Sequence, residues 1–568
     1  MNVVGIWDGH NASACVVQDG VVVAALAEER ITRRKMQRGF PHQALDEVLR
    51  LAAVSPSQVD AVAIAGAYGR LPMRAMGRRF ASRPPGKGPM GLSERAMRHY
   101  ENIMAGIPGL RAAESGISAL LLRARLREHG FPDAVALHLV LHHRAHACAA
   151  ASMVPAPNAD VVTMDGYGDG LCAASWLLDN GRVSLASSRS YLSSAAVTYG
   201  SVCQLLGYRE GEEGKVTALA AAGDPGRLSG FFLGKLGAGD AGRSGGPLGP
   251  RECRNLSRHS PEDVAAGVQA AVEAVVVDDL GRAVAGEGKR SCRLALAGGL
   301  FANVALNRRI VEAQLADWVQ VFPAMGDDGL SVGAAAAAWQ DHTGSLPRFL
   351  GPLLGTPVER DDAAEALSAA GLEFHAPGAP ELAVAVLLSR GLFCAVVAGA
   401  DEFGPRALGN RSLLFPADRR DLADRCQSLL RRDTVMPFAP VVAAERAAAL
   451  FPTGHPCPDQ DDLGLGLMTF AVPAGPGVAA RYPAAVHVDG TARVQVVTRE
   501  ANPGFHAILQ EHTTIAARSL LINTSFNLHG EPIVHGCADA VRTFVESGID
   551  ALLLGPFLAL RAGSGGVA

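Results

Sequence analysis

The segment ADVVTMDGYGDG, residues 159–170, joins a run of apolar residues to a turn rich in aspartate and glycine. The apolar run predicts a buried strand, and the glycines after it predict a tight turn. At such a turn Asp165 and Asp169 are placed to approach a metal ion or phosphate groups. The segment therefore favours an α/β architecture in which polar residues follow the ends of strands.

The same pattern recurs along the chain. Apolar runs that end in a polar or glycine-rich turn occupy residues 3–9, 21–29, 60–66 and 292–300, and helical segments follow several of them. Stretches rich in glycine, proline and cations at 78–91 and 234–250 predict surface loops. Proline and glycine are again frequent at 341–358. We place a domain boundary there, which gives domains 1–345 and 346–568.

Composition narrows the class of protein. The chain has 568 residues, of which 48% are hydrophobic and 19% charged, so it is globular and too long for a single core. Its net charge of -4 supplies no field that would recruit nucleic acid or an acidic membrane surface. The ten cysteines stand singly, and no apolar run is long enough to span a membrane. We expect a soluble, cytoplasmic protein with reduced thiols.

A second segment, LVLHHRAHACAA at 139–150, carries three histidines within five residues. On a helix, His142 and His146 project from one face about a turn apart, which is a spacing that metals favour. One or two carboxylates from strand ends would complete a mixed nitrogen and oxygen site suited to iron(II) or zinc. Asp165 and Asp327 are the preferred candidates, and Asp328 remains an alternative because sequence does not choose between neighbours.

Two further segments of the N-terminal part predict a nucleotide site. In GIWDGHNASAC, at 5–15, a hairpin tip presents side-chain donors and acceptors near backbone amides, as phosphate-binding hairpins do. In LALAGGLFAN, at 294–303, the glycines end a strand and admit close backbone approach, and an asparagine opens a helix. The candidate cofactor contacts of this part, together with the aspartate of the first segment, are Asp8, Asn11, Asp169, Gly298, Gly299 and Asn303.

The C-terminal part carries its own polar blocks. DEFGPRALGNRSLL, at 401–414, places Arg406 and Arg411 around a glycine-rich turn, and guanidinium groups match phosphate and carboxylate oxygens. VDGTARVQVV, at 488–497, predicts a hairpin with Arg493 between apolar positions. INTSFNLHGEPIV, at 522–534, predicts an extended segment with one polar face for adenine, ribose or a carbamoyl group. That face consists of Asn523, Ser525 and Asn527.

The order of these blocks resembles a known family. DGHNASA, EERITRRK, HHRAHA, MDGYGDG, EGEEGKVTALA, AGGLFAN and GDDGLSVGAA look like the N-terminal domain of the O-carbamoyltransferases, which decorate antibiotics and nodulation factors. The resemblance implies an actin-like ATPase domain of two subdomains (ASKHA, TsaD-like), similar to the threonylcarbamoyl transferases of tRNA modification. The C-terminal blocks resemble the family's YrdC-like α/β domain. The resemblance covers nearly the whole chain, and its specificity comes from the number and order of the motifs.

The resemblance also implies a reaction. The C-terminal domain would make carbamoyl-adenylate from carbamoyl phosphate and ATP, with Mg²⁺, and the N-terminal domain would transfer the carbamoyl group to a hydroxyl of a small-molecule natural product. His142, His146, Asp165 and Asp327 would hold Fe(II) or another divalent metal. His10 would be the base, since an imidazole titrates near the working pH, and Lys35 and Lys215 would contact phosphate or the intermediate. We expect a monomer or homodimer that binds no nucleic acid and no membrane.

Departures from the family pattern leave two other readings open. The family has cations in the block before PFAP where this chain has Leu430 and Met436, so that Arg431 or Arg432 must compensate. Asn11 stands where aspartate is commoner. The alternative to an active enzyme is therefore a catalytically impaired actin-like protein that acts as a regulator or scaffold. A tRNA-modifying threonylcarbamoyl transferase is disfavoured by the fused second domain and by the absence of basic patches with interleaved aromatics.

Overall fold

The computed structural model describes residues 1–77, 100, 103–104, 107–237, 245–284, 291–432, 438–452 and 464–561. The loop predicted at 78–91 and Met436 lie outside these residues. The chain divides into two compact units, which are described separately. The first unit contains Met1–Glu29 and Met36–Leu350, and the second contains Arg30–Lys35 and Gly351–Ala568.

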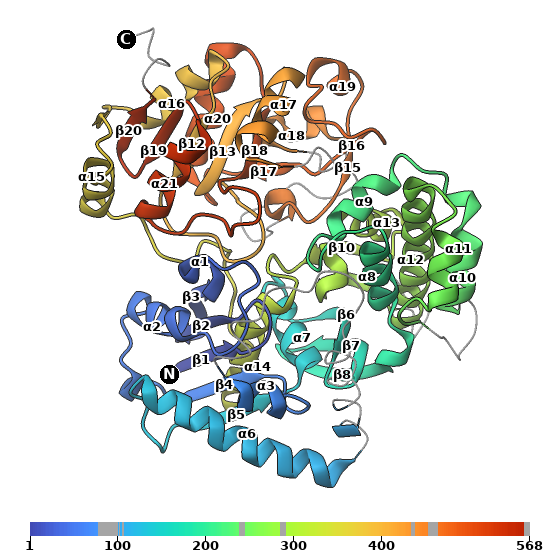
Figure 1. Ribbon diagram of the computed structural model, residues 1–568. Coiled ribbons are helices and arrows are strands. Elements are labelled where there is room, and N and C mark those ends of the chain that lie inside the picture. The colour runs from blue at the N-terminus through green and yellow to red at the C-terminus, as the bar shows by residue number, and fades with distance from the viewer. Residues whose placement is uncertain are drawn as a thin grey trace. The chain divides into compact units, whose positions relative to one another are not determined.

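The first sheet of the first unit contains the N-terminal strands in the order β3-β2-β1-β4-β5 (Figure 1). The strands are β1 (Asn2–Trp7), β2 (Ser13–Gln18), β3 (Val21–Ala27), β4 (Ala61–Ala65) and β5 (Ala136–Val140). β1, β2 and β3 pair in an antiparallel meander, whereas β1, β4 and β5 are parallel. β4 is buried along its whole length, which explains why its sequence is continuously apolar.

The second sheet repeats this arrangement, with the order β10-β9-β6-β7-β8. Its strands are β6 (Ala159–Gly168), β7 (Leu171–Asp179), β8 (Arg182–Ser190), β9 (Ser291–Ala297) and β10 (Ala316–Val321). Again three strands form an antiparallel meander, and β6, β9 and β10 are parallel. The two sheets therefore share one topology, and the predicted mixed α/β class is confirmed.

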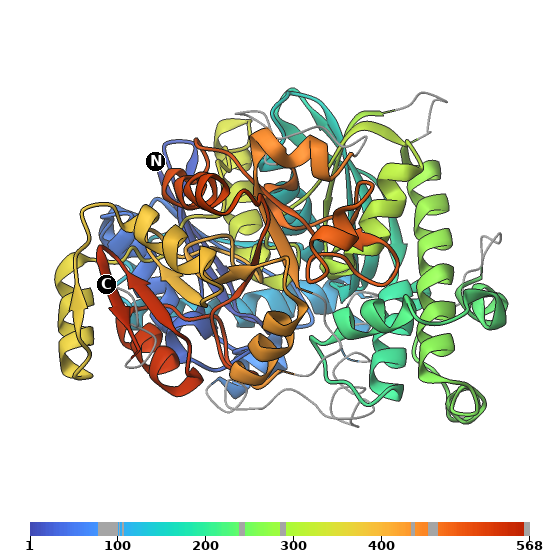
Figure 2. The ribbon, with the colours of Figure 1, turned by 90° about the horizontal axis from the view of Figure 1, so that it is seen from above.

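Helices cover these sheets and fill the space beside them. They are α1 (Glu28–Thr32), α2 (His42–Leu51), α3 (Leu71–Met76), α6 (Pro108–Glu128), α7 (His142–Ser152), α8 (Ala195–Leu205), α9 (Glu213–Ala220), α10 (Ser229–Leu236), α11 (Pro250–Leu256), α12 (Pro261–Val284), α13 (Val304–Glu312) and α14 (Leu330–Thr343). Short 3₁₀ turns are η1 (Pro56–Gln58), η2 (Tyr191–Ser193), η3 (Pro225–Arg227), η4 (Gly299–Ala302) and η5 (Asp327–Gly329). α8 to α13 gather into one helical group around α12 (Figures 1 and 2). The loop predicted from residue 234 is wrong at its start, because α10 continues to Leu236.

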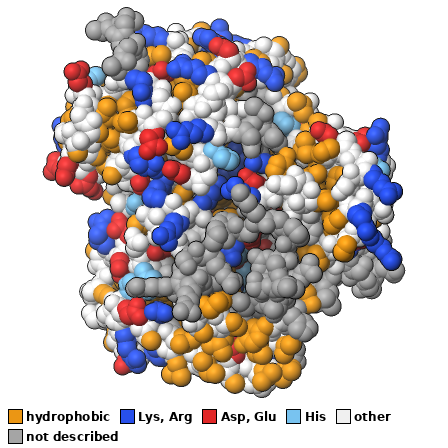
Figure 3. Space-filling view, viewed as in Figure 1, with side chains coloured by type: hydrophobic (Ala, Val, Ile, Leu, Met, Phe, Trp, Pro, Cys, Tyr) orange, Lys and Arg blue, Asp and Glu red, His pale blue; other side chains and the backbone are white. Residues whose placement is uncertain are grey.

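α14 forms the centre of the first unit. It packs against α7 and against β1, β2 and β4. Its run of alanines is fully buried, and a Cβ added at Gly333 would lie 1.7 Å from the carbonyl oxygen of Ala145 on α7. Small residues are therefore required at this contact, which the sequence supplies as GAAAAA. By contrast, α6 exposes Leu110, Ile117 and Leu120, and hydrophobic side chains gather over that helix in Figure 3.

The second unit is built on an eight-stranded mixed sheet with the order β11-β20-β19-β12-β13-β18-β14-β17. Its strands are β11 (Phe374–His375), β12 (Cys394–Val397), β13 (Arg411–Pro416), β14 (Ala439–Ala443), β17 (Gln495–Val497), β18 (Leu521–Ser525), β19 (Ala551–Leu554) and β20 (Phe557–Leu560), with β15 (Val472–Pro473) and β16 (Thr491–Ala492) as a separate pair. Its helices are α15 (Arg360–Ala369), α16 (Pro380–Ser389), α17 (Arg420–Leu429), α18 (Ala444–Leu450), α19 (Val478–Arg481), α20 (Pro503–Ala516), α21 (Cys537–Ser547) and the 3₁₀ turn η6 (Gly464–Leu467). Its core lies between α16, α20 and the sheet.

One predicted element of the second unit is wrong. The segment 488–497 does not form a hairpin, because its two strands pair with different partners: β16 pairs with β15, and β17 pairs with β14. The β17 pairing is parallel and joins residues far apart in the chain. Alternation of apolar and polar residues indicates a strand but does not identify its neighbour.

Candidate metal centre and anion site

Four side chains converge in the first unit: His142 and His146 from α7, Asp165 from β6 and Asp327 from η5. His146 Nε2 lies 3.1 Å from Asp165 Oδ2 and 3.7 Å from Asp327 Oδ1. His142 Nε2 lies 3.5 and 3.7 Å from the same two atoms. One ligand atom from each residue lies within 4.8 Å of the others. The structure thus brings together the four residues that the sequence predicted as ligands.

The geometry of this cluster fits one divalent cation. Bonds of about 2.1 Å to a single ion separate tetrahedral ligand atoms by about 3.4 Å, and the four nitrogen–oxygen distances range from 3.1 to 3.7 Å. Two imidazoles and two carboxylates form a mixed donor set of the kind that iron(II) and zinc accept. The donor set and its spacing therefore suit a transition metal.

The electrostatics of the cluster favour positive charge. Burial alone would raise the pKa of Asp165, but hydrogen bonds with His142 and His146 hold that pKa well below its usual value. Burial alone would lower the pKa of His146, but the two carboxylates outweigh it and raise the pKa to about 9. The carboxylates therefore stabilise a cation at this position, whether it is a proton or a metal ion.

The third histidine of the segment faces another way. His143 Nδ1 lies 2.9 Å from the hydroxyl of Thr163 on β6. Burial lowers the pKa of His143 to about 3, so the ring is neutral. His143 therefore fixes α7 against the sheet and stands outside the cluster.

Backbone geometry sets the position of Asp165. Gly298 has a φ of +107°, and a Cβ added there would lie 2.1 Å from the carbonyl oxygen of Met164. A Cβ on Gly299 would lie 3.2 Å from Asp165 Oδ1. Both glycines therefore admit close approach to the acidic end of β6, and no side chain intervenes.

Asp169 holds the start of α7. Its carboxylate accepts hydrogen bonds from the backbone N–H of His142 at 2.8 Å and of Ala67 at 3.2 Å. Because a negative charge is favourable at a helix N-terminus, Asp169 stabilises the turn that presents His142. Asp169, which the sequence predicted as a cofactor contact, thus binds the backbone of His142 in this structure.

The tip of the β1–β2 hairpin brings His10 to the cluster. His10 Nε2 lies 3.2 Å from Asp327 Oδ2, and its Nδ1 has no hydrogen-bond partner within the described chain. Asp8 is buried in an ion pair with Arg74, at 2.8 Å. Asn11 has a φ of +54°, a left-handed conformation that asparagine adopts readily. Of the hairpin residues, His10 is thus the one nearest the candidate ligands.

The other predicted residues of the N-terminal part lie elsewhere. Asp328 stays outside the cluster, and burial raises the pKa of its carboxyl to about 7. Asn303 caps α13 and exchanges hydrogen bonds with Gln269. Lys215 on α9 donates to Glu212 at 2.7 Å. Lys35 is exposed and belongs to the segment that clusters with the second unit.

In the second unit, Glu402 shapes the glycine-rich turn that precedes β13. One of its carboxylate oxygens accepts the backbone N–H groups of Leu408, Asn410 and Arg411. Arg411 is fully buried and donates to the carbonyl oxygens of Thr356, Ala398, Gly399, Asn410 and His535. The guanidinium of Arg411 is therefore committed to the backbone.

Arg406 and Arg493 form a pair of buried cations for which the described part of the chain shows no ion pair with a carboxylate. Burial lowers the pKa of Arg406 to about 10, and burial together with the charge of Arg406 holds the pKa of Arg493 well below its usual value. The Nε atom of each is buried and has no acceptor among the described residues. Two adjacent guanidinium groups with free donors are suited to a phosphate or carboxylate.

Arg432 lies beside the end of β18. Its guanidinium donates to Thr524 Oγ1 at 2.6 Å, to Ser525 Oγ at 3.0 Å and to Asn527 Oδ1 at 3.0 Å. The predicted residues Arg432, Ser525 and Asn527 thus meet. Leu430 is fully buried, so its apolar side chain belongs to the core.

Sequence reasoning missed residues that position these sites. Arg74 neutralises Asp8, and Glu402 holds the arginine turn. Arg30 is buried and pairs with Asp401 at 3.0 Å. A signal for Arg30 was present in EERITRRK, the block from which only Lys35 was chosen.

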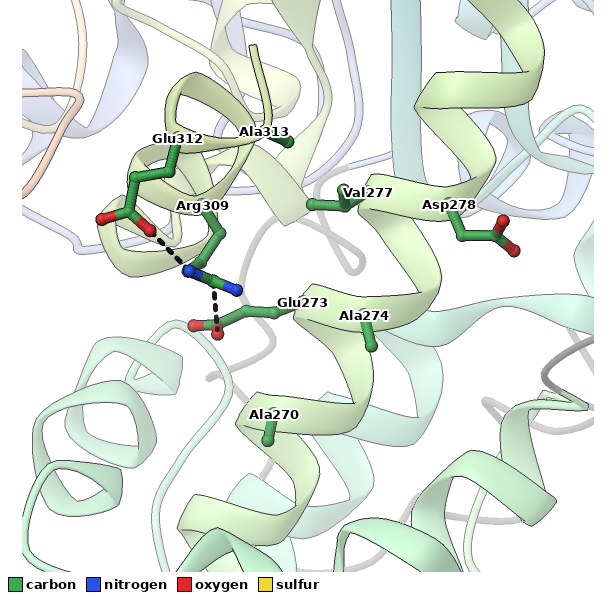
Figure 4. A pocket seen from close by; sticks show the side chains of 8 residues that line it. All are labelled: Ala270, Glu273, Ala274, Val277, Asp278, Arg309, Glu312 and Ala313. Atoms are coloured by element: carbon green, nitrogen blue, oxygen red, sulfur yellow. Dashed lines mark hydrogen bonds and ion pairs between the residues drawn. The ribbon is translucent and has the colours of Figure 1, made fainter. Parts of the chain in front are cut away.

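A pocket of about 420 Å³ lies between α12 and α13 (Figure 4). Figure 4 shows Arg309 between Glu273 and Glu312, to which it is paired at 3.8 and 2.6 Å. Its floor is apolar, and none of its lining residues is among the predicted site residues. The remaining charged lining residue, Asp278, pairs with Arg282 outside the pocket at 2.7 Å.

The fold and the two clusters define a two-unit α/β protein with a candidate metal centre and a candidate anion site. Family models match at residues 2–237 and 250–336, as the carbamoyltransferase N-terminus, and at 385–561, as the carbamoyltransferase C-terminus. The chain belongs to the carbamoyltransferase family, and it is a carbamoyltransferase enzyme.

Named relatives agree with this assignment. The chain is 30% identical to nodulation protein NolNO of Sinorhizobium fredii, over 97% of this chain and 78% of the relative. It is 31% identical to nodulation protein NolO of Bradyrhizobium diazoefficiens, over 73% of this chain and 78% of the relative. A solved structure of an activator of 2-hydroxyisocaproyl-CoA dehydratase from Clostridium difficile is 12% identical over 60% of this chain and 95% of that chain, with a TM-score of 0.33.

Within the described residues, no helix is both long and apolar enough to cross a membrane. The cysteines that the structure describes are all unpaired thiols.

Proposed function

We propose that this carbamoyltransferase makes carbamoyl-adenylate from carbamoyl phosphate and ATP in its second unit. The carbamoyl group then passes to a hydroxyl of a small-molecule natural product in the first unit. The observation that carries the proposal is the cluster of His142, His146, Asp165 and Asp327 with His10 at 3.2 Å from Asp327.

The balance of atoms fixes the first half-reaction. Water releases phosphate from carbamoyl phosphate and leaves carbamate. A carbamate oxygen attacks the α-phosphorus of ATP, which is bound with Mg²⁺, and pyrophosphate departs. We assign Arg406 and Arg493 to the anionic oxygens of these reactants, because each has a buried Nε that finds no acceptor among the described residues, which favours an anion. We assign Arg432, which donates to Ser525 and Asn527, as a further polar contact for these reactants.

The topology supports a fold assignment for each unit. The first unit repeats one five-stranded arrangement twice, as an actin-like ATPase with two subdomains would. We assign the second unit, with its eight-stranded mixed sheet, to the YrdC-like class. These assignments agree with the order of motifs along the chain.

We assign His142, His146, Asp165 and Asp327 as ligands of Fe(II) or another divalent cation. When bound, such a cation supplies Lewis-acid stabilisation of negative charge that develops on the carbamoyl oxygen. The protein's own contribution is to hold two imidazoles and two carboxylates in fixed positions. Asp169 orients His142 through its backbone N–H, and Gly298 and Gly299 keep the approach to Asp165 open.

His10 is the proposed base of the second half-reaction. An alcohol is a poor nucleophile near neutral pH, so its proton must be removed as the new C–O bond forms. His10 Nε2 lies 3.2 Å from Asp327 Oδ2, so the carboxylate is close enough to orient the ring, while part of the His10 side chain is open to solvent. The proton moves from the acceptor hydroxyl to His10, and AMP departs from the carbamoyl carbon.

The test incubates the protein with carbamoyl phosphate, ATP, Mg²⁺ and a panel of hydroxylated natural products. We expect pyrophosphate release and a product heavier by one carbamoyl group. Pyrophosphate without such a product would mean that the panel lacks the acceptor. The absence of both pyrophosphate and carbamoylated product would contradict the proposal and favour the regulator or scaffold alternative.

A further inference from the structure

Two buried amide side chains of the second unit form a chain of hydrogen bonds. Asn523 Nδ2 donates to the carbonyl oxygen of Ala407 at 3.1 Å and to Gln495 Oε1 at 2.7 Å. Gln495 Nε2 donates to the carbonyl oxygen of Leu408 at 2.8 Å. Asn523 is 1% exposed and Gln495 is 3% exposed. The chain therefore joins β18 and β17 to the arginine turn in an environment closed to water.

The two carbonyl groups fix the orientation of both amides. A backbone carbonyl only accepts, so the NH₂ ends of Gln495 and Asn523 must point to Leu408 and Ala407. Both hydrogens of the Asn523 amide are then used. Its Oδ1 remains as a buried acceptor, and no donor reaches it from the part of the chain that the structure describes. Such an atom requires a partner that offers an N–H or O–H group.

The neighbouring groups are cations. Arg406 precedes Ala407, and Arg493 lies two residues before Gln495. Each arginine has a buried Nε that lacks an acceptor within the described residues. The site thus offers donors for anionic oxygens and, at Asn523, one acceptor. Of the groups on carbamate, the carboxylate oxygens match the arginines and the NH₂ group matches Asn523.

We infer that Asn523 Oδ1 accepts a hydrogen bond from the carbamoyl NH₂ group, and that Gln495 is the positioning residue that fixes the orientation of the Asn523 amide. The inference rests on the proposed function of the second unit. It gives that unit a means to select a carbamoyl donor over an acyl donor with a methyl group in place of NH₂. A methyl group would leave Asn523 Oδ1 without a partner.

The test compares pyrophosphate release with carbamoyl phosphate and with acetyl phosphate, as the ratio of the two kcat/KM values. We expect Asn523→Leu to lower that ratio about 10-fold to 100-fold, because a hydrogen bond specific to the carbamoyl group is lost. Gln495→Met should lower the ratio in the same direction while Asn523 itself is retained. Asn502→Leu is the matched control: within the described residues the Asn502 side chain caps α20 and bonds to Asn410, so the ratio should stay unchanged.

The outcomes separate the inference from the function on which it rests. No pyrophosphate from the unaltered protein with carbamoyl phosphate would contradict the proposed function and, with it, this inference. Pyrophosphate release with an unchanged ratio in Gln495→Met and Asn523→Leu would contradict the inference alone.

A second experiment compares ATP with purine riboside triphosphate, which lacks the 6-amino group. If Asn523→Leu alters the preference for ATP over purine riboside triphosphate but not the preference for carbamoyl phosphate, Asn523 Oδ1 binds adenine and the inference is wrong.

Discussion

The histidines at 142, 143 and 146 follow one another on a single helix, yet their neighbours give them different chemistry. His142 and His146 face the carboxylates of Asp165 and Asp327, whereas His143 faces the hydroxyl of Thr163. Carboxylates favour a charged or metal-bound ring, and a neutral hydroxyl in a buried environment favours a neutral ring. The environment of each ring, and not its residue type, determines its role.

The metal content of variants tests the candidate ligands. If the cluster holds the proposed divalent cation, we expect His146→Ala to lose at least about nine-tenths of the bound metal, because two carboxylates and one imidazole hold a cation more weakly than the complete set. His143→Gln is the matched control on the same helix and should retain the metal. The measurement is metal per protein after dialysis. Equal metal loss in both variants would contradict the assignment.

The buried pair of Asp8 and Arg74 determines the stability of the hairpin that carries His10. Arg74→Met leaves a buried carboxylate without its counter-ion, so we expect the free energy of unfolding to fall by roughly 3–5 kcal/mol. Asp8→Asn combined with Arg74→Met should recover much of that loss, since no unpaired charge remains. Urea denaturation of the unaltered protein and the two variants measures both effects. A double variant no more stable than Arg74→Met would count against this explanation.

His512 predicts a pH dependence of the second unit. Burial lowers its pKa from 6.5 to about 4, while a hydrogen bond with the backbone of Arg518 opposes the shift only in part. The unfolded chain therefore binds a proton at a higher pH than the folded chain does. Stability is fully present above about pH 6.5 and falls as the pH decreases toward 4.

The expected loss from His512 between pH 7.5 and pH 5 is about 2 kcal/mol. In His512→Gln this part of the pH dependence should disappear, although other groups continue to titrate. Urea midpoints of both proteins at the two pH values give the comparison. Parallel pH profiles would mean that His512 is not the responsible group.

At the scale of elements, the metal cluster depends on how closely β6 and β9 meet. Asp165 lies in β6 just beyond Thr163, the last residue of β6 that pairs with β9, and Gly298 follows the end of β9. The carboxyl end of a strand is a common place for a site, because parallel neighbours bring their ends to one edge. The glycine allows this edge to close without a side chain between the strands.

Gly298→Ala tests this close approach. Its φ of +107° and the 2.1 Å contact with Met164 both oppose a Cβ. Gly344→Ala is the matched control, because Gly344 has a φ of +86° but no atom near its Cβ position. We expect the control to lose about 1 kcal/mol of stability from backbone strain alone. Gly298→Ala should lose more and should also bind less metal, as judged by denaturation and metal analysis.

At the scale of the whole molecule, the chain does not divide in sequence order. Residues 30–35 belong to the same unit as residues 351–568, although the residues before and after them in the sequence belong to the first unit. Arg30 pairs with Asp401, and Arg33 donates to the carbonyl oxygens of Pro532 and Ile533. A segment of the N-terminal part is thus required to complete the second unit.

The proposed two-step reaction predicts how variants behave when they are mixed. His10→Ala should release pyrophosphate without carbamoylated product, and Arg493→Ala should release neither. We expect a mixture of the two to give less than about a tenth of the unaltered activity, because water hydrolyses a released adenylate before a second molecule captures it. Product formation is followed by mass spectrometry. Full activity in the mixture would show that the adenylate passes freely through solution.

The sequence by itself determined the mixed α/β class and indicated His142, His146 and Asp165. It left Asp327 and Asp328 as alternatives, and the structure placed Asp327 in the cluster. Strand patterns depend on local alternation, and two histidines four residues apart share a helix face wherever that helix is placed. Strand patterns and shared helix faces depend on short segments, so they can be predicted from the sequence before the fold is known.

Only the tertiary structure decided the partners of each group. It paired Asp8 with Arg74 and committed Arg411 to backbone carbonyls. It also buried the Nε atoms of Arg406 and Arg493 with no acceptor in the described part of the chain. It also joined β17 to β14, where the alternating pattern had predicted a hairpin. A hydrogen bond or ion pair depends on residues far apart in the chain, and their distance is set by packing rather than by local sequence.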